Sequence, residues 1–256
     1  MTSTDNNWPE NWFVRRVRET GSTNADLFAD ALAGAPSHSV LVADYQTAGR
    51  GRLDRTWQAK PGENLLVSLL FRSKANLLTS WPRIVALAAT RACQELISIG
   101  QLNVDAAPII KLKWPNDLLL DGRKLGGMLS TSDHEKQFVV VGIGINVGWA
   151  PQEAVALGEF FSEKMPTPVG LLKNMLLEIS RIEKLSLTEQ HQQYVAQLAT
   201  LGKLVRVELT NGLMITGQAQ DVDIEGRLLV VDTADNSFRH VIDTGDVVHL
   251  RNADHG

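Results

Sequence analysis

The stretch from Ile109 to Leu129, IIKLKWPNDLLLDGRKLGGML, limits the possible folds of this chain more than any other. Two apolar runs flank Asp121-Gly122, a dipeptide typical of a two-residue β-hairpin turn because both central residues need a positive φ. Pro115 cannot donate a backbone hydrogen bond, so we expect the strand that carries Lys113 to end or kink there. The stretch therefore predicts a β-hairpin.

The register of this hairpin predicts open space beside polar side chains. Counting outward from the turn gives four expected pairs: Leu120 with Arg123, Leu119 with Lys124, Asp117 with Gly126, and Asn116 with Gly127. Two glycines opposite two polar residues leave room for a ligand. The alternative, a surface hairpin with solvated lysines, is supported equally well by composition alone.

The composition is that of an ordinary globular protein with a sizeable core. The 256 residues are 44% hydrophobic and 21% charged, and the formal net charge of −4 argues against a nucleic-acid-binding surface spread over the whole molecule. Cys93 is the single cysteine, and its apolar neighbours at helical spacing indicate a core position. Because the chain has neither a signal-peptide pattern nor an apolar run long enough to span a bilayer, we expect a cytoplasmic protein that binds no membrane.

Hydrophobic periodicity predicts an irregular mixture of strands and helices over the first 200 residues. Besides the hairpin, the expected strands are Trp12–Val17, Val40–Tyr45, Asn64–Phe71 and Phe138–Val147. The expected helices are one capped by Ser22-Thr23-Asn24, then Trp81–Ile99, Leu171–Leu185 and Glu189–Leu198. Several strands follow one another directly, which favours an α+β fold with a mixed sheet flanked by helices.

From Leu201 onward the pattern changes to short strands separated by turn residues, with no helix signal. The expected strands are Leu204–Thr210, Leu213–Ala219, Leu228–Asp232, Phe238–Ile242 and Val247–Leu250. We therefore predict two domains, residues 1–200 and residues 201–256, the second a small SH3-like β-barrel. A packing or adaptor module without chemistry is the alternative for the second domain.

The cationic residues are the remaining candidates for catalysis once the common catalytic signatures are excluded. The chain has no GxxxxGK[ST] loop and no GxSxG elbow, GIGIN has the wrong spacing for GxGxxG, and the histidines lack zinc-ligand spacing. The remaining cations are Arg50, Arg52 and Arg55 in one loop, with Lys113 and Lys124 on the hairpin. Fixed cations beside glycine-lined space suit a reaction whose transition state carries phosphate charge.

Five motifs together resemble those of the bacterial biotin protein ligases. They are GSTN (Gly21–Asn24), TAGRGR (Thr47–Arg52), KWPND (Lys113–Asp117), RKLGGML (Arg123–Leu129) and GIGIN (Gly142–Asn146). The resemblance covers residues 12 to 150 and implies a class II synthetase-like fold. It also implies two reaction steps. The carboxylate of biotin attacks the α-phosphate of ATP to give biotinyl-5′-AMP, and a lysine of the biotin carboxyl carrier protein of acetyl-CoA carboxylase then attacks the mixed anhydride.

The resemblance assigns two sets of binding residues. Those implied for biotin are Ser22, Thr23, Asn24, Gln46, Gly49, Arg50, Lys113, Gly126 and Gly127. Those implied for ATP and the adenylate are Arg50, Arg52, Trp57, Asn116, Asp117, Lys124, Gly142, Gly144 and Asn146.

Lys113 is the central catalytic side chain of this hypothesis. An ammonium between the carboxylate and the α-phosphate would offset their repulsion and stabilise the charge that develops on phosphorus. Arg50 and Arg52 are also expected to act in catalysis, because their loop would close over the adenylate and exclude water. ATP and Mg²⁺ are the expected cofactors. The magnesium is expected to bind through ATP, with Asp117 as the protein candidate for assisting it or the acceptor lysine.

The sequence departs from the family pattern in two places. Ser130-Thr131-Ser132 stand where related sequences continue with apolar residues and an acid, which leaves the end of that strand open. Only about eleven residues, expected to form a loosely held tail, precede the catalytic region, too few for a helix-turn-helix domain. We therefore expect a ligase that binds no DNA and represses no genes. Whether it is a monomer or a homodimer is left open.

Two other functions fit parts of the sequence. A lipoate or octanoyl-transfer enzyme would share the fold, but the histidine-containing, arginine- and glycine-rich pattern expected there is missing. A non-enzymatic ligand-sensing or RNA-binding protein would account for the GRGR loop and the small barrel, yet no aromatic platform is interleaved with the basic residues.

Overall fold

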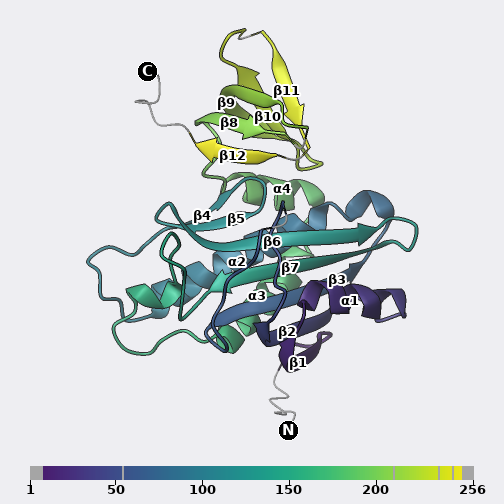
Figure 1. Ribbon diagram of the computed structural model, residues 1–256, viewed down its shortest axis with the longest axis vertical. Coiled ribbons are helices and arrows are strands. Elements are labelled where there is room, and N and C mark those ends of the chain that lie inside the picture. Colours follow the sequence, from purple (N-terminus) through teal and green to yellow (C-terminus); the bar gives the residue numbers. More distant parts are fainter. Residues whose placement is uncertain (1–7, 54, 210, 236, 244, 250–256) are drawn as a thin grey trace.

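The computed structural model describes residues 8–249 apart from 54, 210, 236 and 244. A seven-stranded sheet forms its centre, with β1 and β2 parallel and the other neighbours antiparallel (Figure 1). In spatial order the strands are β1 (Phe13–Thr20), β2 (Ser39–Gln46), β3 (Asn64–Arg72), β7 (Phe138–Asn146), β6 (Arg123–Asp133), β5 (Asp117–Leu120) and β4 (Ile110–Lys113). This mixed sheet confirms the predicted α+β class.

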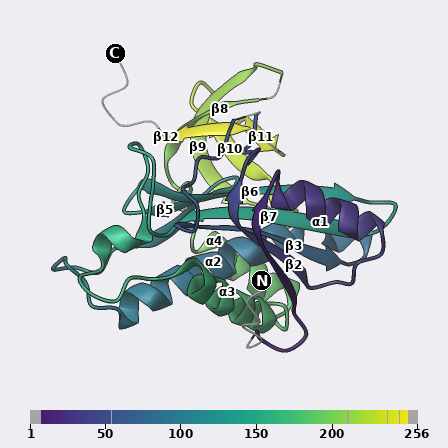
Figure 2. The same cartoon turned by 60° about the horizontal axis from the view of Figure 1, so that its bottom comes forward.

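Helices cover both faces of this sheet. Those described are α1 (Thr23–Leu32), α2 (Ser80–Ile99), α3 (Pro168–Ile182) and α4 (Leu187–Val195), with 3-10 turns at Ala75–Leu77 and Leu157–Phe160. Helix α1 packs on one face and helices α2 and α3 on the other (Figure 2). Successive residues of β3 consequently point into different cores: Leu69 joins the large cluster under α2, and Leu70 joins the smaller cluster under α1. A strand apolar on both faces is what the continuous run NLLVSLLF predicts.

The hairpin forms at the predicted turn, but its register is corrected by one residue. Asp121 and Gly122 have φ values of 47° and 80°. The pairs nearest the turn are Leu119 with Lys124 and Leu120 with Arg123, as predicted. Beyond them the fully buried Leu125 forms a β-bulge. Because the bulge adds one residue to β6, every later pair is shifted by one position.

The bulge changes which residues face the hairpin glycines. Asp117 lies opposite Gly127, and its predicted pairing with Gly126 is wrong. Asn116 was predicted opposite Gly127 but instead faces Met128, whose backbone N–H donates to the Asn116 carbonyl at 2.9 Å.

Five further strands form an antiparallel C-terminal sheet, the part of the chain predicted to contain no helix. In spatial order they are β11 (Arg239–Ile242), β10 (Leu228–Asp232), β9 (Met214–Val222), β8 (Leu204–Glu208) and β12 (Asp246–His249). The predicted ends of two strands, Thr210 and Leu250, lie outside the described residues. The division into two domains at residue 200 stays a prediction.

The predicted N-terminal tail is only partly within the described chain. Its first seven residues lie outside the described residues. Trp8, by contrast, packs against the core, and the Lys173 ammonium lies 5.4 Å from the centre of its ring. The prediction of a loosely held tail is therefore wrong from Trp8 onward.

Cys93 lies fully buried on α2, as its apolar neighbours predicted. Burial disfavours the charged thiolate and raises the pKa of this thiol to about 12. None of the described helices combines the length and apolar character that a membrane crossing requires.

His249 sits where the C-terminal sheet meets the central sheet. Its Nε2 lies 3.2 Å from Thr200 Oγ1, and the same hydroxyl accepts a hydrogen bond from the backbone N–H of Trp114 at 3.0 Å. Burial, together with the positive charges of Lys113 and Lys203, lowers the pKa of His249 to about 4. The ring is therefore neutral at pH 7.

We expect this junction to lose stability in acid. The pKa of His249 is lower in the folded chain than its ordinary value of 6.5, so the unfolded chain binds the proton first. The stability gained from a neutral ring is present above pH 6.5 and is lost as the pH falls toward 4. In urea titrations between pH 7 and 4.5, His249→Gln should lose less stability than the parent, whereas the exposed control His134→Gln should follow the parent. An unchanged pH dependence in His249→Gln would contradict this assignment.

Candidate active site

A pocket of about 1130 Å³ opens where the central sheet, the start of α1, the loop after β2 and the C-terminal sheet meet. Most of the predicted site residues line it: Ser22, Thr23, Asn24, Gln46, Arg50, Arg52, Trp57, Asn116, Asp117, Lys124, Gly127, Gly142, Gly144 and Asn146. Lys113, Gly49 and Gly126 do not. The five motifs thus converge on one cavity, although three of their predicted residues lie outside its lining.

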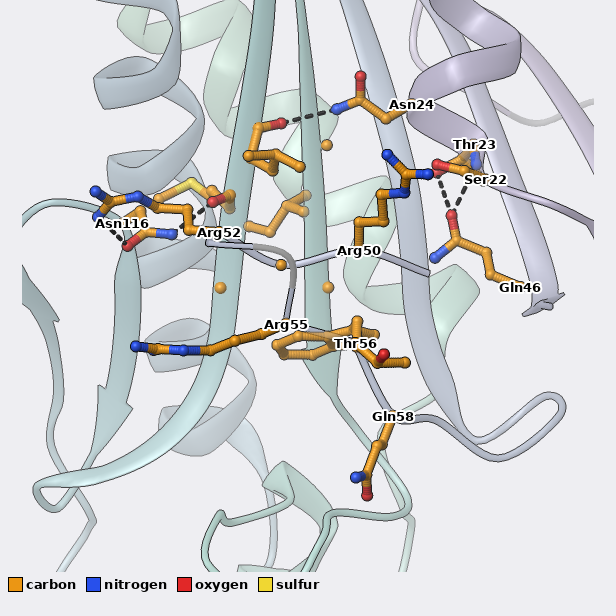
Figure 3. A pocket seen from close by; sticks show the side chains of 18 of the residues that line it. Ser22, Thr23, Asn24, Gln46, Arg50, Arg52, Arg55, Thr56, Gln58 and Asn116 are labelled. Atoms are coloured by element: carbon orange, nitrogen blue, oxygen red, sulfur yellow. Dashed lines mark hydrogen bonds between the residues drawn. The ribbon is translucent and has the colours of Figure 1, made fainter. Parts of the chain in front are cut away.

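The first turn of α1 forms a neutral polar wall of the pocket. Ser22 caps the helix by accepting a hydrogen bond from the Ala25 N–H at 3.5 Å. The backbone N–H and the hydroxyl of Thr23 both donate to Gln46 Oε1, at 2.7 and 2.9 Å (Figure 3). Because the Gln46 oxygen is engaged in this way, the orientation of its amide is fixed and its NH₂ group is left as a donor.

Ser68 completes this wall and was not identified from the sequence. It is fully buried in β3, and its hydroxyl lies 2.9 Å from that of Thr23. A polar residue in the middle of the run NLLVSLLF was the available signal, since buried hydroxyls need hydrogen-bond partners. Asn24 adds an amide that donates to the Leu129 carbonyl at 2.8 Å and ties α1 to β6.

The loop from Thr47 to Trp57, which we call the arginine loop, folds back on itself over the pocket. Gly51 N–H donates to the Arg55 carbonyl at 2.7 Å, and Trp57 N–H donates to the Gly49 carbonyl at 3.0 Å. These bonds hold Gly49 next to Trp57, and a Cβ added at Gly49 would lie 3.2 Å from both Gln46 Nε2 and the Trp57 carbonyl oxygen. Gly49 therefore supports the loop from behind the lining.

The arginines of this loop point in different directions. Arg50 extends toward Ser22 and Thr23, whereas Arg52 extends toward Asn116 (Figure 3). Arg52 Nη1 donates to Asn116 Oδ1 at 3.4 Å and to the Gly245 carbonyl of the C-terminal sheet at 3.1 Å. Burial lowers the pKa of Arg52, and the nearby carboxylates of Asp246 and Asp117 partly offset this effect.

The hairpin supplies an ion pair to the opposite side of the pocket. Lys124 Nζ lies 2.6 Å from Asp117 Oδ1, with the two side chains 42% and 21% exposed. The neighbouring Asn116 is held by its amide, which donates to the Met128 carbonyl at 2.6 Å. Lys124 therefore provides a cation that is both positioned and accessible.

Lys113 is not among the residues that line this pocket. It ends β4, the edge strand, and its charge acts on His249 at the junction with the C-terminal sheet. The catalytic role assigned to Lys113 stays a prediction. Gly126, also predicted to line the ligand gap, instead lies against the backbone of β7, where an added Cβ would be 2.7 Å from the Gly144 carbonyl oxygen.

Glycines on β6 and β7 make room for the indole of Trp57. A Cβ at Gly144 would lie 2.5 Å from this ring, and one at Gly127 would lie 3.3 Å from it. Gly142 is close to Asn24 instead, with 2.7 Å between its virtual Cβ and the amide nitrogen. The predicted close approach at these glycines therefore comes from two pocket side chains.

Asn146 and the described carboxylates limit what the pocket can hold. Asn146 lines it, but its buried amide already contacts Asn64 Nδ2 at 3.4 Å and the Val155 carbonyl at 3.3 Å. Within the described residues, no group of three or more His, Cys, Asp or Glu side chains could hold a metal ion.

Comparisons with known proteins agree with this geometry. The sequence pattern of the Biotin/lipoate A/B protein ligase family matches residues 15–147. The chain is 37% identical over 243 residues to the biotin--[acetyl-CoA-carboxylase] ligase of Mycobacterium tuberculosis, covering 92% of this chain and 88% of that protein. It is 30% identical over 224 residues to the bifunctional ligase/repressor BirA of Bacillus subtilis, covering 82% and 66%. The structure of the biotin protein ligase from Aquifex aeolicus in complex with biotin and ATP superimposes with a TM-score of 0.71 at 27% identity, over 93% of this chain and 99% of that one.

Gly144→Ala should destabilise the chain through Trp57. The added methyl group would overlap the indole and force a shift, which typically costs about 1–3 kcal/mol in a packed site. Urea unfolding of Gly144→Ala should show this loss in the parent background and a smaller loss in a Trp57→Ala background. Equal losses in the two backgrounds would mean that another contact explains the glycine.

Proposed function

This chain belongs to the biotin/lipoate A/B protein ligase family, and we propose that its pocket carries out the two steps of a biotin–[acetyl-CoA-carboxylase] ligase. One observation carries this proposal: a single cavity joins a neutral hydrogen-bonding wall to a cationic one. A neutral ring with a carboxylate tail fits the first wall, and a triphosphate fits the second. Arg50 extends between the two.

The neutral wall suits the ureido ring of biotin. The fixed NH₂ group of Gln46 and the hydroxyl of Ser22 are donors that such a carbonyl would accept. Thr23 already bonds to Gln46 and to Ser68, so the role of these two hydroxyls is to hold that amide in place. The carboxylate of biotin would then extend toward Arg50 and Lys124.

The first step joins this carboxylate to the α-phosphate of ATP. A carboxylate oxygen attacks phosphorus, the bond to the bridging oxygen breaks, and pyrophosphate leaves with its electron pair. We assign to Lys113 the ammonium that offsets repulsion between the two anions, and Lys124, which lines the pocket, is a second cation suited to this role. Arg50 and Arg52 act in the same step, their positive charge stabilising the negative charge on the phosphoryl oxygens.

The nucleotide fits the side of the pocket formed by Trp57 and the glycines of β6 and β7. The indole offers an apolar face for adenine, and Gly127 and Gly144 leave the space in which this indole lies. Mg²⁺ bound to ATP would neutralise phosphate charge. Asp117 is the protein group suited to assist it, since its carboxylate lines the pocket beside Lys124.

In the second step an acceptor lysine attacks the carbonyl carbon of the mixed anhydride and AMP leaves. We propose the biotin carboxyl carrier protein as the acceptor, in agreement with the activity named for the Mycobacterium tuberculosis relative. The amine attacks only after losing a proton, and we assign Asp117, a carboxylate of the pocket lining, to accept it. The single, buried cysteine is consistent with the reducing cytoplasm that we propose as the location.

The reaction is tested by giving the purified chain ATP with either biotin or lipoate. We expect an acyl-adenylate and pyrophosphate with biotin, followed by transfer when the carrier domain is added. Adenylate formation with lipoate alone would refute the biotin assignment while leaving the family membership intact.

The two hairpin lysines give a matched test of the catalytic cation. Lys124→Ala should slow biotinyl-AMP formation by about 10²- to 10³-fold, the usual cost of losing one fixed charge in a phosphoryl-transfer site. Lys113→Ala should remove biotinyl-AMP formation while leaving the fold intact. The rate of pyrophosphate release and the melting temperature should be measured for both variants. A rate of Lys113→Ala within about threefold of the parent would contradict the role given to Lys113 and leave Lys124 as the catalytic cation.

A further inference from the structure

The C-terminal sheet reaches the pocket at the start of β12. Asp246 lines the pocket, and its carboxylate forms an ion pair with Arg55 of the arginine loop. The preceding residue, Gly245, accepts the hydrogen bond from Arg52. Two consecutive residues of the sheet thus hold two arginines that lie more than 190 positions earlier in the sequence.

Arg52 and Arg55 differ in their burial and in the direction in which the pKa of each guanidinium is shifted. The Arg55 side chain is 62% exposed at the rim, and the hydrogen bond with Asp246 raises the pKa of its guanidinium. Arg52 lies deeper in the pocket, and burial lowers the pKa of its guanidinium. A phosphate would gain more from the less hydrated Arg52, since Arg55 already has a carboxylate partner and faces water.

The same sheet also holds the opposite wall of the pocket. Trp114, which precedes the proline turn of the hairpin, is 2% exposed and donates from Nε1 to the Gly226 carbonyl at 2.9 Å. Asn116 and Asp117 follow directly along the chain and line the pocket. The C-terminal sheet therefore contacts both the hairpin and the arginine loop and fixes the distance between them.

We propose that Asp246 is a positioning residue that fastens the arginine loop over the pocket through Arg55. Arg55 is the anchor of the loop, and Arg50 and Arg52 line the pocket. Asp246 does not itself touch the phosphates, because its negative charge would repel them.

The catalytic consequence rests on the proposed function. If the pocket holds biotinyl-AMP, loosening the loop lets this anhydride escape or meet water before an acceptor arrives. The ion pair between Asp246 and Arg55, which we call the latch, does not depend on that chemistry, because it forms without a ligand. Opening of the loop without ligand and loss of the intermediate are therefore separate measurements.

The first measurement is limited proteolysis of the ligand-free chain by trypsin, which cleaves after arginine. Asp246→Asn should speed cleavage at Arg50, Arg52 and Arg55 by about threefold to fivefold, the factor expected for one exposed ion pair. Asp246 is remote in sequence from these sites, so the substitution leaves their intrinsic susceptibility unchanged. Asp246→Glu keeps the charge and should restore most of the protection.

Asp243→Asn is the matched control. Asp243 is exposed on the same turn, carries the same charge and does not line the pocket. The Asp243→Asn variant should be cleaved at the same rate as the parent. The proposal is overturned if Asp246→Asn is also cleaved like the parent, if both variants are cleaved faster to the same extent, or if mass spectrometry finds the first cut in the C-terminal sheet.

The second measurement follows biotinyl-AMP made by the enzyme without an acceptor. Asp246→Asn should release it about threefold to fivefold faster than the parent, with a smaller change in the rate at which it forms. Asp243→Asn should retain it. Faster cleavage with unchanged retention would overturn the catalytic role of the latch, whereas failure of every variant and the parent to form the adenylate would overturn the proposed function alone.

Discussion

The central sheet is buried on both faces, and this constraint determines where chemistry is possible. Strands β3 and β7 contribute to a core on each side, so nearly every position along them is apolar. Ser68, Gly142, Gly144 and Asn146 are exceptions that line the pocket, whereas the polar residues at the two ends of β3, Asn64 and Arg72, do not line it. Burying a polar group without hydrogen-bond partners is costly. A polar residue or a glycine in such a strand therefore marks a position whose role is not core packing.

The sequence was sufficient for the parts of the fold that depend on local chemistry. The Asp121-Gly122 turn, the cap at Ser22 and the two-sided apolar strand β3 were all predicted, because each follows from a few neighbouring residues. The register of β5 with β6 from Leu118 onward was not predicted correctly. It depends on the bulge at Leu125, which is stabilised by burial against residues far away in the sequence.

The same limit explains the errors in the candidate site. The motifs predicted which segments meet, but not which side chains of each segment point inward. Lys113 and Lys124 lie on β4 and β6, which β5 separates, and only the tertiary fold brings the charge of Lys113 near His249. Asp246 carries no motif at all, and its place in the pocket comes entirely from tertiary packing.

Cys93 has a consequence for how this molecule reacts with its surroundings. Alkylating agents and oxidants attack the thiolate, and a thiol whose pKa is raised to about 12 inside a helix packed on the sheet offers almost none at neutral pH. Since the chain has no other cysteine, it offers thiol-directed reagents such as maleimides almost no reactive thiolate at neutral pH. A cysteine introduced on its surface would be the single reactive position, so one dye or one cross-link could be attached without altering the native sequence elsewhere.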